Sequence, residues 1–390
     1  MVNKDNIPAI RFAGFTDPWE QRKLSEVFTS YTDPVEIPHD GYERLGIRSH
    51  AKGTFHNYVP AGHELQTAQM HRVAANKFIV NITFGWEHAV AVTDENDAGK
   101  LVSHRFPQFS LSEELAPQFL KYIILDERFR HHLWLASPGG AGRNRVLNLS
   151  EMLQYEIQIP SVTEQRIIAD VLINLDNLIT LHQRKYESLM QIKKSMLRKM
   201  FPCEGSRYPE VRFAGFTDAW EQRKVSDVAN RYDNLRIPVA ANLRVPGSTP
   251  YYGANGIQDY VEGFTHEGEF VLVAEDGAND LKNYPVKCVN GRIWVNNHAH
   301  VLQSKPEMAD NKFLAYSMSQ ADIESLLVGG GRAKLNAEVM MGIDLMLPSK
   351  SEQVAIGQYL TQLDNLITLH QRKYETLQRV KKSLLQKMFV

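Results

Sequence analysis

The sequence predicts an α+β protein with pseudo-two-fold symmetry, in which two mixed α/β domains are joined by two long helices that form an antiparallel coiled coil. Repetition is the main observation behind this prediction. Residues 11–27 recur at 212–228 with three differences, and residues 175–201 recur at 363–389 with six. The segments enclosed by these repeats have almost no sequence in common. A constant frame therefore holds two different inserts.

The repeats divide the chain into five parts. A period of about 200 residues is too long for a solenoid, in which each short repeat stacks on its neighbour. A duplicated module is the simpler interpretation. We predict a first motif and insert at 1–159, a long helix at 160–201, a linker at 202–210, a second motif and insert at 211–347, and a second long helix at 348–390.

Composition excludes several classes of protein. The two cysteines, Cys203 and Cys288, provide neither a disulfide framework nor a four-thiolate zinc site. The N-terminus lacks the apolar stretch of a signal peptide, and no apolar run is long enough to span a membrane, so we expect a cytoplasmic protein. A net charge of −1 argues mildly against a nucleic-acid binder, although a local basic face can still bind DNA.

Both inserts are predicted to mix strands and helices. In the first, alternating β-branched residues at 77–93 indicate a hairpin around Gly85, and residues 115–137 have helical spacing with Pro117 in the first turn. In the second, residues 269–277 and 291–303 are typical of strands, and 311–328 of a helix.

The long helices are predicted from start signals and heptad spacing. Pro160 and Pro348 end strand-like runs, and the Ser-x-x-Glu segments that follow, 161–164 and 349–352, are typical of capping boxes. Either the two helices pair with each other, which symmetry makes antiparallel, or each packs only on its own domain. The expected coiled-coil seam is Ile168, Leu175, His182, Leu189 and Met196 in the first helix, and Ile356, Leu363, His370, Leu377 and Leu384 in the second.

Two further features concern these helices. His182 and His370 occupy equivalent positions near mid-helix, so an antiparallel pair should bring their rings together, with at least one ring neutral. The later half of each helix is rich in Lys and Arg. Such a basic stretch is either an ordinary solvated face or a docking surface for DNA or an acidic partner.

Candidate DNA contacts fall on glycine-rich and polar loops. The stretches 139–148 and 329–336 lack the G-K-[ST] ending of a nucleotide-binding loop. Their backbone amides and basic residues are either a phosphate contact or a plain connector; the basic residues are Arg143, Arg145, Arg332 and Lys334. Other side chains suited to reading bases, or to an ordinary surface, are Arg44, Arg48, Lys52, His56, Trp86, His88 and Arg105 in the first insert, and Tyr251, Asn255, Asn279, Lys282, Asn296 and Asn297 in the second.

Catalytic signals are missing from the sequence. It contains no Asn/Asp-Pro-Pro-Tyr motif, no nuclease carboxylate cluster, no H-E-x-x-H and no G-x-S-x-G. His298 and His300 alternate along a predicted strand, but the sequence offers them no third metal ligand. We therefore predict no catalytic residue and no metal site in this chain.

The order of these blocks resembles the specificity subunit of type I restriction-modification systems. The resemblance rests on "RFAGFTD-WEQRK", an insert, and a Pro-x-x-x-Glu-Gln entry into a long helix ending "KMF", all present twice. It implies that each insert is a target recognition domain for one half of a bipartite, asymmetric DNA site, and that the helices set the distance between the halves. It also implies double-stranded DNA, two methyltransferase subunits and restriction subunits as partners.

By the same resemblance, S-adenosylmethionine, ATP and Mg²⁺ belong to those partners, and this chain is a non-catalytic subunit without a cofactor of its own. Two other classes remain open from the residues. One is a stand-alone enzyme that modifies or cleaves DNA and dimerises through a coiled-coil arm. The other is a scaffold that does not bind DNA. The target sequence and the spacer length are not readable from the residues.

Overall fold

Two compact units make up the chain in a computed structural model that describes residues 7–139, 145–329 and 333–389. The first unit comprises Met1–Leu181 and Tyr374–Val390, and the second comprises His182–Lys373. Each unit therefore contains one motif, one insert and a part of both long helices. These units differ from the five consecutive parts expected from the sequence. Each long helix packs partly on the insert that precedes it and partly on the insert of the other repeat.

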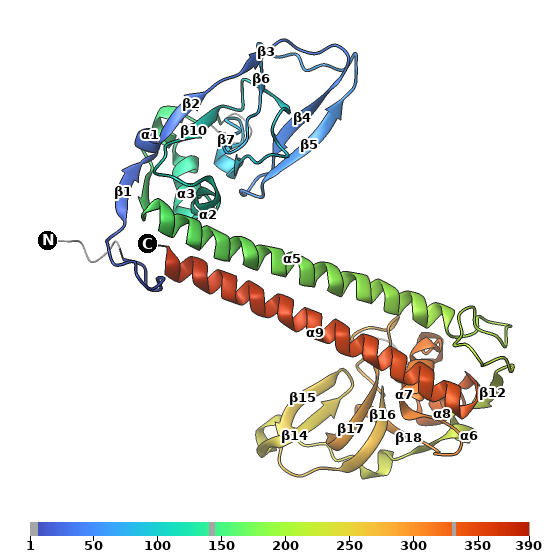
Figure 1. The fold of residues 1–390 in the computed structure, drawn as a ribbon. Coiled ribbons are helices and arrows are strands. Elements are labelled where there is room, and N and C mark those ends of the chain that lie inside the picture. The colour runs from blue at the N-terminus through green and yellow to red at the C-terminus, as the bar shows by residue number, and fades with distance from the viewer. Residues whose placement is uncertain (1–6, 140–144, 330–332, 390) are drawn as a thin grey trace. The chain divides into compact units, whose positions relative to one another are not determined.

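In the described part of the first insert, the strands form two largely antiparallel sheets, accompanied by short helices (Figure 1). One sheet has the order β2-β10-β7-β8, and the other has the order β3-β6-β9-β4-β5, in which β4 and β9 are parallel. The first sheet is formed by β2 (Phe28–Tyr31), β10 (Gln108–Leu111), β7 (Phe78–Val80) and β8 (Val90–Val92). The second is formed by β3 (Pro34–Val35), β6 (Met70–Arg72), β9 (Leu101–Ser103), β4 (Tyr42–Ile47) and β5 (Thr54–Val59). The helices are α2 (Pro117–Ile123), α3 (Glu127–Leu135) and α4 (Leu149–Met152).

In the first insert, the sequence predicted the types of secondary structure correctly, but not where each helix ends. The hairpin around Gly85 is confirmed, because β7 pairs antiparallel with β8 on either side of a 3-10 turn at Gly85–Glu87. Pro117 does begin a helix. The single helix predicted at 115–137 is wrong, since α2 and α3 are separate helices. Asp126 separates the two helices because it is the N-cap of α3, and its side chain accepts a hydrogen bond from the Arg128 amide.

The second insert is built on one six-stranded sheet of order β13-β18-β16-β17-β14-β15 (Figure 1). Its strands are β13 (Ala229–Arg231), β18 (Ala299–Ser304), β16 (His266–Ala274), β17 (Val286–Val295), β14 (Pro246–Gly253) and β15 (Gly256–Val261). Helices α7 (Asn311–Gln320) and α8 (Ala337–Met341) follow. The strand predicted at 269–277 is present as the later part of β16. The single strand predicted at 291–303 is wrong in one respect, because a turn at 296–298 divides it into the end of β17 and most of β18. The helix predicted to reach residue 328 ends at Gln320, and a 3-10 turn at Glu324–Leu326 follows.

The repeat motifs have the same structure in both units. In each, a two-stranded ribbon joins the motif to the strand before the long helix: β1 (Glu20–Lys23) pairs with β11 (Glu156–Ile159), and β12 (Glu221–Lys224) with β19 (Asp344–Leu347). Short helices α1 (Leu24–Val27) and α6 (Val225–Val228) follow β1 and β12. Trp19 and Trp220, just before the ribbons, are buried in the two main cores.

The long helices are α5 (Val162–Lys199) and α9 (Lys350–Met388), and they pack together as predicted. In the first unit, Ile168 and Leu172 of α5 share a core with Met388 of α9. In the second, Leu189 and Met196 of α5 pack against the core that contains Ile356, Leu360 and Leu363 of α9. The start of each helix therefore meets the end of the other, which is the antiparallel arrangement.

The capping boxes predicted at the start of both helices are wrong in one respect. Glu164 is fully buried and binds Arg11 through two hydrogen bonds of 2.7 and 2.8 Å instead of reaching back to its own N-cap. Glu352 binds Arg212 in the same way, with both distances 2.7 Å. A bidentate Arg–carboxylate pair is stronger than a neutral capping bond, so the distant partner wins. These pairs attach each motif to a long helix.

The seam contains a polar layer formed by the two equivalent histidines. Nδ1 of His182 lies 2.8 Å from Nδ1 of His370, and the ring centroids are 5.1 Å apart. This distance agrees with the expected pairing. One Nδ1 must donate and the other must accept, so the accepting ring is neutral. Such a layer favours one register of the two helices, at some cost in stability.

We predict that this histidine pair makes stability fall as the pH is lowered. Burial lowers the pKa of both rings below the ordinary 6.5, and the neighbouring cations Lys185 and Lys373 lower it further. The unfolded chain therefore binds more protons than the folded chain as pH falls through about 6.5, and stability decreases until the folded pKa values are passed. Between pH 7.5 and 5.5 the melting temperature should drop by about 1–3 °C more for the wild type than for the His182→Asn/His370→Asn variant. Equal drops would contradict the prediction; all other histidines are common to both proteins.

Among the described residues, no helix combines the length and the apolar character needed to cross a membrane.

Candidate nucleic-acid interface

Three loops of the second insert are joined by side-chain contacts. In the turn between β14 and β15, the Asn255 amide nitrogen donates to the Gly277 carbonyl, and its side-chain oxygen accepts from the Asn279 amide, both at 2.9 Å. In the turn between β17 and β18, His298 Nδ1 lies 2.7 Å from Asp276 Oδ1. The loops at 253–256, 275–283 and 296–298 therefore form one continuous polar surface. We call it the second loop surface.

The predicted contacts of the second insert divide by burial. Asn255 is exposed, but both ends of its amide are engaged, so its role is to hold the loops together. Tyr251 is 1% exposed with its hydroxyl bonded to Val239, and Asn296 is 4% exposed and accepts from the His298 amide. Neither side chain is presented at the surface. The exposed candidates that remain are Asn279, Lys282 and Asn297.

A largely buried charged cluster adjoins the second loop surface through Glu275. Asp233, Glu275 and His300 bring their ligand-type atoms within 4.8 Å of one another. The expectation that the histidines at 298 and 300 lack further ligands is therefore wrong for His300. The missing partners come from residues 25 and 67 positions away, which spacing along one strand does not reveal.

Contacts within this cluster favour an ion-pair network over a metal site. Arg236 lies 2.6 Å and Lys334 2.8 Å from the carboxylate of Glu275. Burial raises the pKa of Glu275, but the hydrogen bonds from Lys334 and Arg236 outweigh burial and leave that pKa below its usual value. His300 Nε2 donates to the Leu335 carbonyl at 2.9 Å, and His300 Nδ1, which faces the cluster, lies 2.7 Å from Asp233 Oδ2, so both ring nitrogens already have partners within the chain.

Lys334 has a position suited to its predicted role. It follows the glycine stretch at 329–331, pairs with Val328 and Asp276 through isolated β-bridges, and keeps 47% of its side chain exposed. Val328 and Lys334, on either side of the glycine stretch, are thus paired, and Lys334 is bridged to Asp276 of the second loop surface. Arg332 lies outside the described residues, as does Arg143 in the first insert.

In the first insert, the tip of the β4–β5 hairpin is fixed to the Gly85–Glu87 turn. The amides of His50 and Ala51 donate to the carbonyls of Glu87 and His88, at 2.9 and 2.8 Å. His50 and Ala51 both have left-handed backbone angles, φ 62° and 49°, which are uncommon for such residues. Backbone strain of this type is typical of functional sites. We call this hairpin tip and turn the first loop surface.

Several candidates lie on or near the first loop surface. Arg48 and Lys52 are exposed at the hairpin tip, and the Arg48 guanidinium stacks 5.3 Å from the Phe55 ring. Trp86 is half-buried in the turn, where its indole nitrogen donates to the Thr83 carbonyl at 3.2 Å. The structure therefore brings Arg48, Lys52 and Trp86 together.

The remaining candidates of the first insert have other environments. His88 is 3% exposed, and its Nε2 is 2.7 Å from the Ile124 carbonyl; burial lowers its pKa. Such a ring cannot contact a base from the surface. His56 on β5 is engaged with Asp97 at 2.8 Å. Arg44 is half-buried on β4, and Arg105 is exposed.

An exposed aromatic site beside the first glycine stretch was missed by the sequence analysis. Trp134 of α3 is 44% exposed, the Arg145 guanidinium lies 4.7 Å from its ring, and the His131 ring stacks on it at 6.1 Å. Flat cationic and aromatic groups suit stacking on bases and contact with phosphates. The i, i+3 spacing of His131 and Trp134 was visible in the sequence, but their exposure was not.

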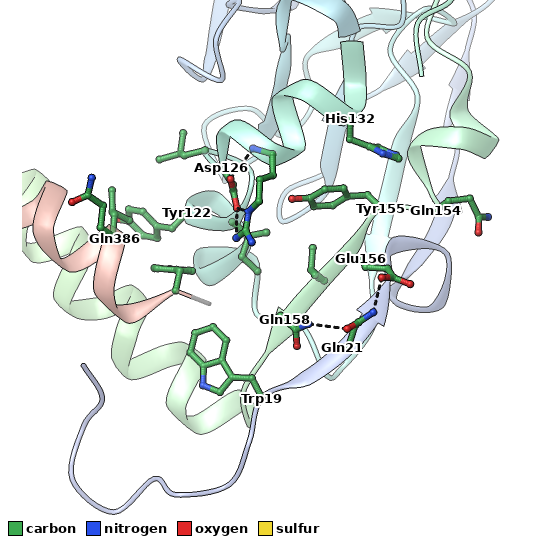
Figure 2. Close-up of a pocket in the computed structure, with 16 residues that line it drawn as sticks. Trp19, Gln21, Tyr122, Asp126, His132, Gln154, Tyr155, Glu156, Gln158 and Gln386 are labelled. Atoms are coloured by element: carbon green, nitrogen blue, oxygen red, sulfur yellow. Dashed lines mark hydrogen bonds and ion pairs between the residues drawn. The ribbon is translucent and has the colours of Figure 1, made fainter. Parts of the chain in front are cut away.

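The first unit also contains a pocket of about 690 Å³, where α2, α3, the β1–β11 ribbon and the end of α9 meet (Figure 2). Trp19 and Tyr122 line it, and a chain of hydrogen bonds runs from Gln158 to Gln21, at 3.0 Å, and on to Glu156, at 2.5 Å. None of the candidate DNA contacts is among its lining residues. The pocket belongs to the junction of insert and frame.

The fold defines a class of protein in which two dissimilar inserts share one duplicated helical frame. Residues 16–191 and 217–379 match the family described as type I restriction modification DNA specificity domain. The chain belongs to this family.

The chain is also similar to individual proteins with related names. A putative type I restriction enzyme specificity subunit of Haemophilus influenzae is 45% identical over 146 residues, 37% of this chain and 38% of that protein. The MjaVIII specificity subunit of Methanocaldococcus jannaschii is 22% identical over 255 residues, 59% of this chain and 60% of that protein. The chain thus matches less than two thirds of the length of either relative. A crystal structure of the S subunit from M. genitalium has a similar fold, with a TM-score of 0.64 at 15% identity over 98% of this chain and 99% of that one.

Proposed function

We propose that this chain is the DNA-recognition subunit of a type I restriction-modification complex, in which each insert reads one half of a bipartite, asymmetric site. The observation that carries the proposal is the pairing of a constant frame with two inserts of different architecture. Nearly identical frame segments suit two copies of one partner, whereas different sheets and loops suit different half-sites. The first and second loop surfaces are the proposed reading surfaces, with Arg48, Lys52 and Trp86 in one, and Asn279, Lys282, Asn297 and Lys334 in the other.

Two methyltransferase subunits are the proposed partners of the helices. Apolar side chains remain exposed at matched positions of the two repeats: Leu178 and Leu366 are 43% and 42% exposed, and Ile192 and Val380 are 40% and 41% exposed. Leu181 and Leu369 form a third such pair. Apolar residues exposed twice at equivalent positions suit a partner that binds twice. S-adenosylmethionine is then expected on these partners, and ATP and Mg²⁺ on restriction subunits.

The basic later halves of the helices are less available for DNA than their composition indicates. Lys193 and Lys381 lie 2.5 Å from Asp364 and Asp176, and Lys199 lies 2.6 Å from Glu210. Part of the positive charge is therefore neutralised within the chain. We assign these stretches mainly to helix pairing and to partner contacts.

Exchange of one insert tests the proposal directly. Replacing residues 28–158 with the insert of another family member should change one half of the methylated sequence and leave the other half intact, because each insert has its own core. The measurement is sequencing of methylated adenines in cells that carry the methyltransferase partner with the wild-type or the exchanged chain. Simultaneous change of both halves would show that the inserts do not read independently.

A control separates the proposal from the stand-alone enzyme. The purified chain alone, incubated with DNA, Mg²⁺ and S-adenosylmethionine, should neither methylate nor cleave. Activity without a partner would overturn the assignment as a non-catalytic subunit. Salt-dependent binding to DNA of mixed sequence would distinguish it from a scaffold without DNA affinity.

A further inference from the structure

The two inserts share a short sequence on the helix that faces the frame. Helix α2 contains Phe119-Leu120-Lys121-Tyr122, and α7 contains Phe313-Leu314-Ala315-Tyr316. Both phenylalanines and both leucines are at most 1% exposed. The surrounding strands differ in number and order, so this Phe-Leu-x-Tyr element is a common feature of otherwise unrelated inserts.

The phenylalanine of this element completes the same aromatic cluster in both units. Phe119 stacks on Phe389 at 5.4 Å and meets Trp19 edge-on at 5.9 Å. In the second unit, Phe313 stacks on Phe201 at 5.5 Å and meets Trp220 edge-on at 5.8 Å. In each case the tryptophan comes from the repeat motif, and the second phenylalanine comes from the end of a long helix or just after it.

The tyrosine forms a second matched contact, which includes both long helices. Tyr122 donates its hydroxyl to Asp176 of α5 at 3.0 Å, and Lys381 of α9 lies 2.5 Å from the same carboxylate. Lys381 also lies 5.7 Å from the centroid of the Tyr122 ring. Figure 2 shows Tyr122 in the lining of the pocket at this junction.

In the second unit the roles of the two helices are exchanged. Tyr316 donates to Asp364 of α9 at 2.6 Å, and Lys193 of α5 lies 2.5 Å from that carboxylate and 5.6 Å from the Tyr316 ring. Burial raises the pKa of Tyr122 and of Tyr316, and the adjacent aspartate raises it further, so both hydroxyls stay protonated donors. Each Tyr–Asp–Lys node thus joins one insert to both helices.

A third matched contact fixes the start of the same insert helices. Gln165 accepts from the Ala116 amide at 2.8 Å, and Gln353 accepts from the Asp310 amide at 3.1 Å. Ala116 and Asp310 are the N-cap residues of α2 and α7. Both glutamines also donate to a carbonyl of the preceding insert loop, Glu114 or Met308. The frame therefore holds each insert helix at its N-cap, its phenylalanine and its tyrosine.

We propose that Phe-Leu-x-Tyr is the seating element that an insert needs to be carried by this frame, and that the Tyr–Asp–Lys node is the positioning group that sets the orientation of the insert against both helices. The effect of this element on DNA recognition rests on the proposed function, whereas its role in attaching the insert to the frame does not. The phenylalanine provides buried contact area, and the tyrosine provides direction, because a hydrogen bond to a charged acceptor restricts rotation about the helix axis. The tyrosines are positioning residues and do not contact DNA.

The test uses the complete complex with its methyltransferase partners, carrying Tyr122→Phe or Tyr316→Phe. The measured quantity is the methylation rate on DNA with the correct spacer divided by the rate on DNA whose spacer is one base pair longer or shorter. Loss of one such hydrogen bond should lower this ratio roughly fivefold, while both half-site sequences stay the same. Tyr208→Phe, at an exposed tyrosine of the linker, is the matched control and should leave the ratio unchanged.

Two further measurements keep the proposal falsifiable. If Tyr316→Phe does not fold, Lys193→Gln removes the ion pair with Asp364 without changing the insert core, and it should also lower the ratio.

Hydrogen exchange on the chain alone needs no DNA: Tyr316→Phe should accelerate exchange in α7 but not in β16 and β17. An unchanged ratio with a lowered melting temperature would overturn the positioning role, as would unchanged exchange in α7. A wild-type complex that methylates no specific sequence would instead overturn the proposed function, and the exchange result would still decide the seating element.

Discussion

Adding four residues to each long helix, after Thr180 and after Thr368, is expected to lengthen the spacer between the two half-sites by about one or two base pairs. Four helical residues add about 6 Å, and B-DNA rises about 3.4 Å per base pair. The two positions are equivalent in the repeats, 188 residues apart, and lie next to the paired histidines. Four residues rotate the apolar seam by only about 40°, so the pairing can largely be kept. Sequencing of methylated sites measures the spacer directly.

Two related variants serve as controls for this prediction. Adding two residues at each site turns the seam by about 200° and should abolish assembly with the methyltransferase. Adding four residues to α5 alone should also fail, because the start of each helix packs against the end of the other in both units. If the double four-residue variant keeps the original spacer, the helices do not set the distance, and the bound partners do.

Glu352→Gln is expected to cost about 3–5 kcal/mol in the free energy of unfolding of the second unit. The Glu352 side chain is fully buried and the Arg212 side chain is 15% exposed, so the substitution leaves a guanidinium without its counter-charge in the protein interior. Glu164→Gln should act in the same way in the first unit, where the Arg11 side chain is 12% exposed. Urea denaturation followed by tryptophan fluorescence measures the loss, since Trp19 and Trp220 lie in the two cores.

The matched control removes a similar pair from the surface. Arg223 lies 2.6 Å from Glu221, but both side chains are about half exposed, so Arg223→Gln should cost less than about 1 kcal/mol. The double variant Arg212→Met/Glu352→Leu, which removes both charges, should lose less stability than Glu352→Gln. Equal effects of Glu352→Gln and Arg223→Gln would show that the buried pair does not anchor the motif.

The Arg11–Glu164 and Arg212–Glu352 pairs explain two features of the repeats: each motif contains an arginine at the same position, and each long helix begins with a glutamate at the same position. In the sequence this glutamate has the spacing of a capping box, because Ser-x-x-Glu before an apolar run is a local pattern. The true partner is 153 residues away in the first copy and 140 in the second. Local patterns cannot identify a partner at that separation.

The sequence predicted the types of side chain and the loops that form the candidate interface, but not which of those side chains are exposed. Side-chain type and loop position pointed to Arg48, Lys52, Asn279 and Lys334, which lie on exposed loops. The same criteria also selected His88, Tyr251 and Asn296, which are buried. Burial depends on which strands and helices cover a residue, so it is a property of the tertiary structure. Trp134, which is exposed, was missed for the same reason.

The sequence by itself determined the duplicated plan, the two long helices, their antiparallel pairing and the meeting of His182 with His370. These features follow from identity between repeats and from heptad periodicity, both of which can be recognised in the sequence without knowledge of any contact between distant residues. Only the tertiary structure decided the Arg–Glu anchors, the charged cluster around His300 and the shared seat of the two inserts. Each of these depends on groups that are distant in sequence and meet in a low-dielectric interior, where satisfying a buried charge or hydrogen bond outweighs local preference.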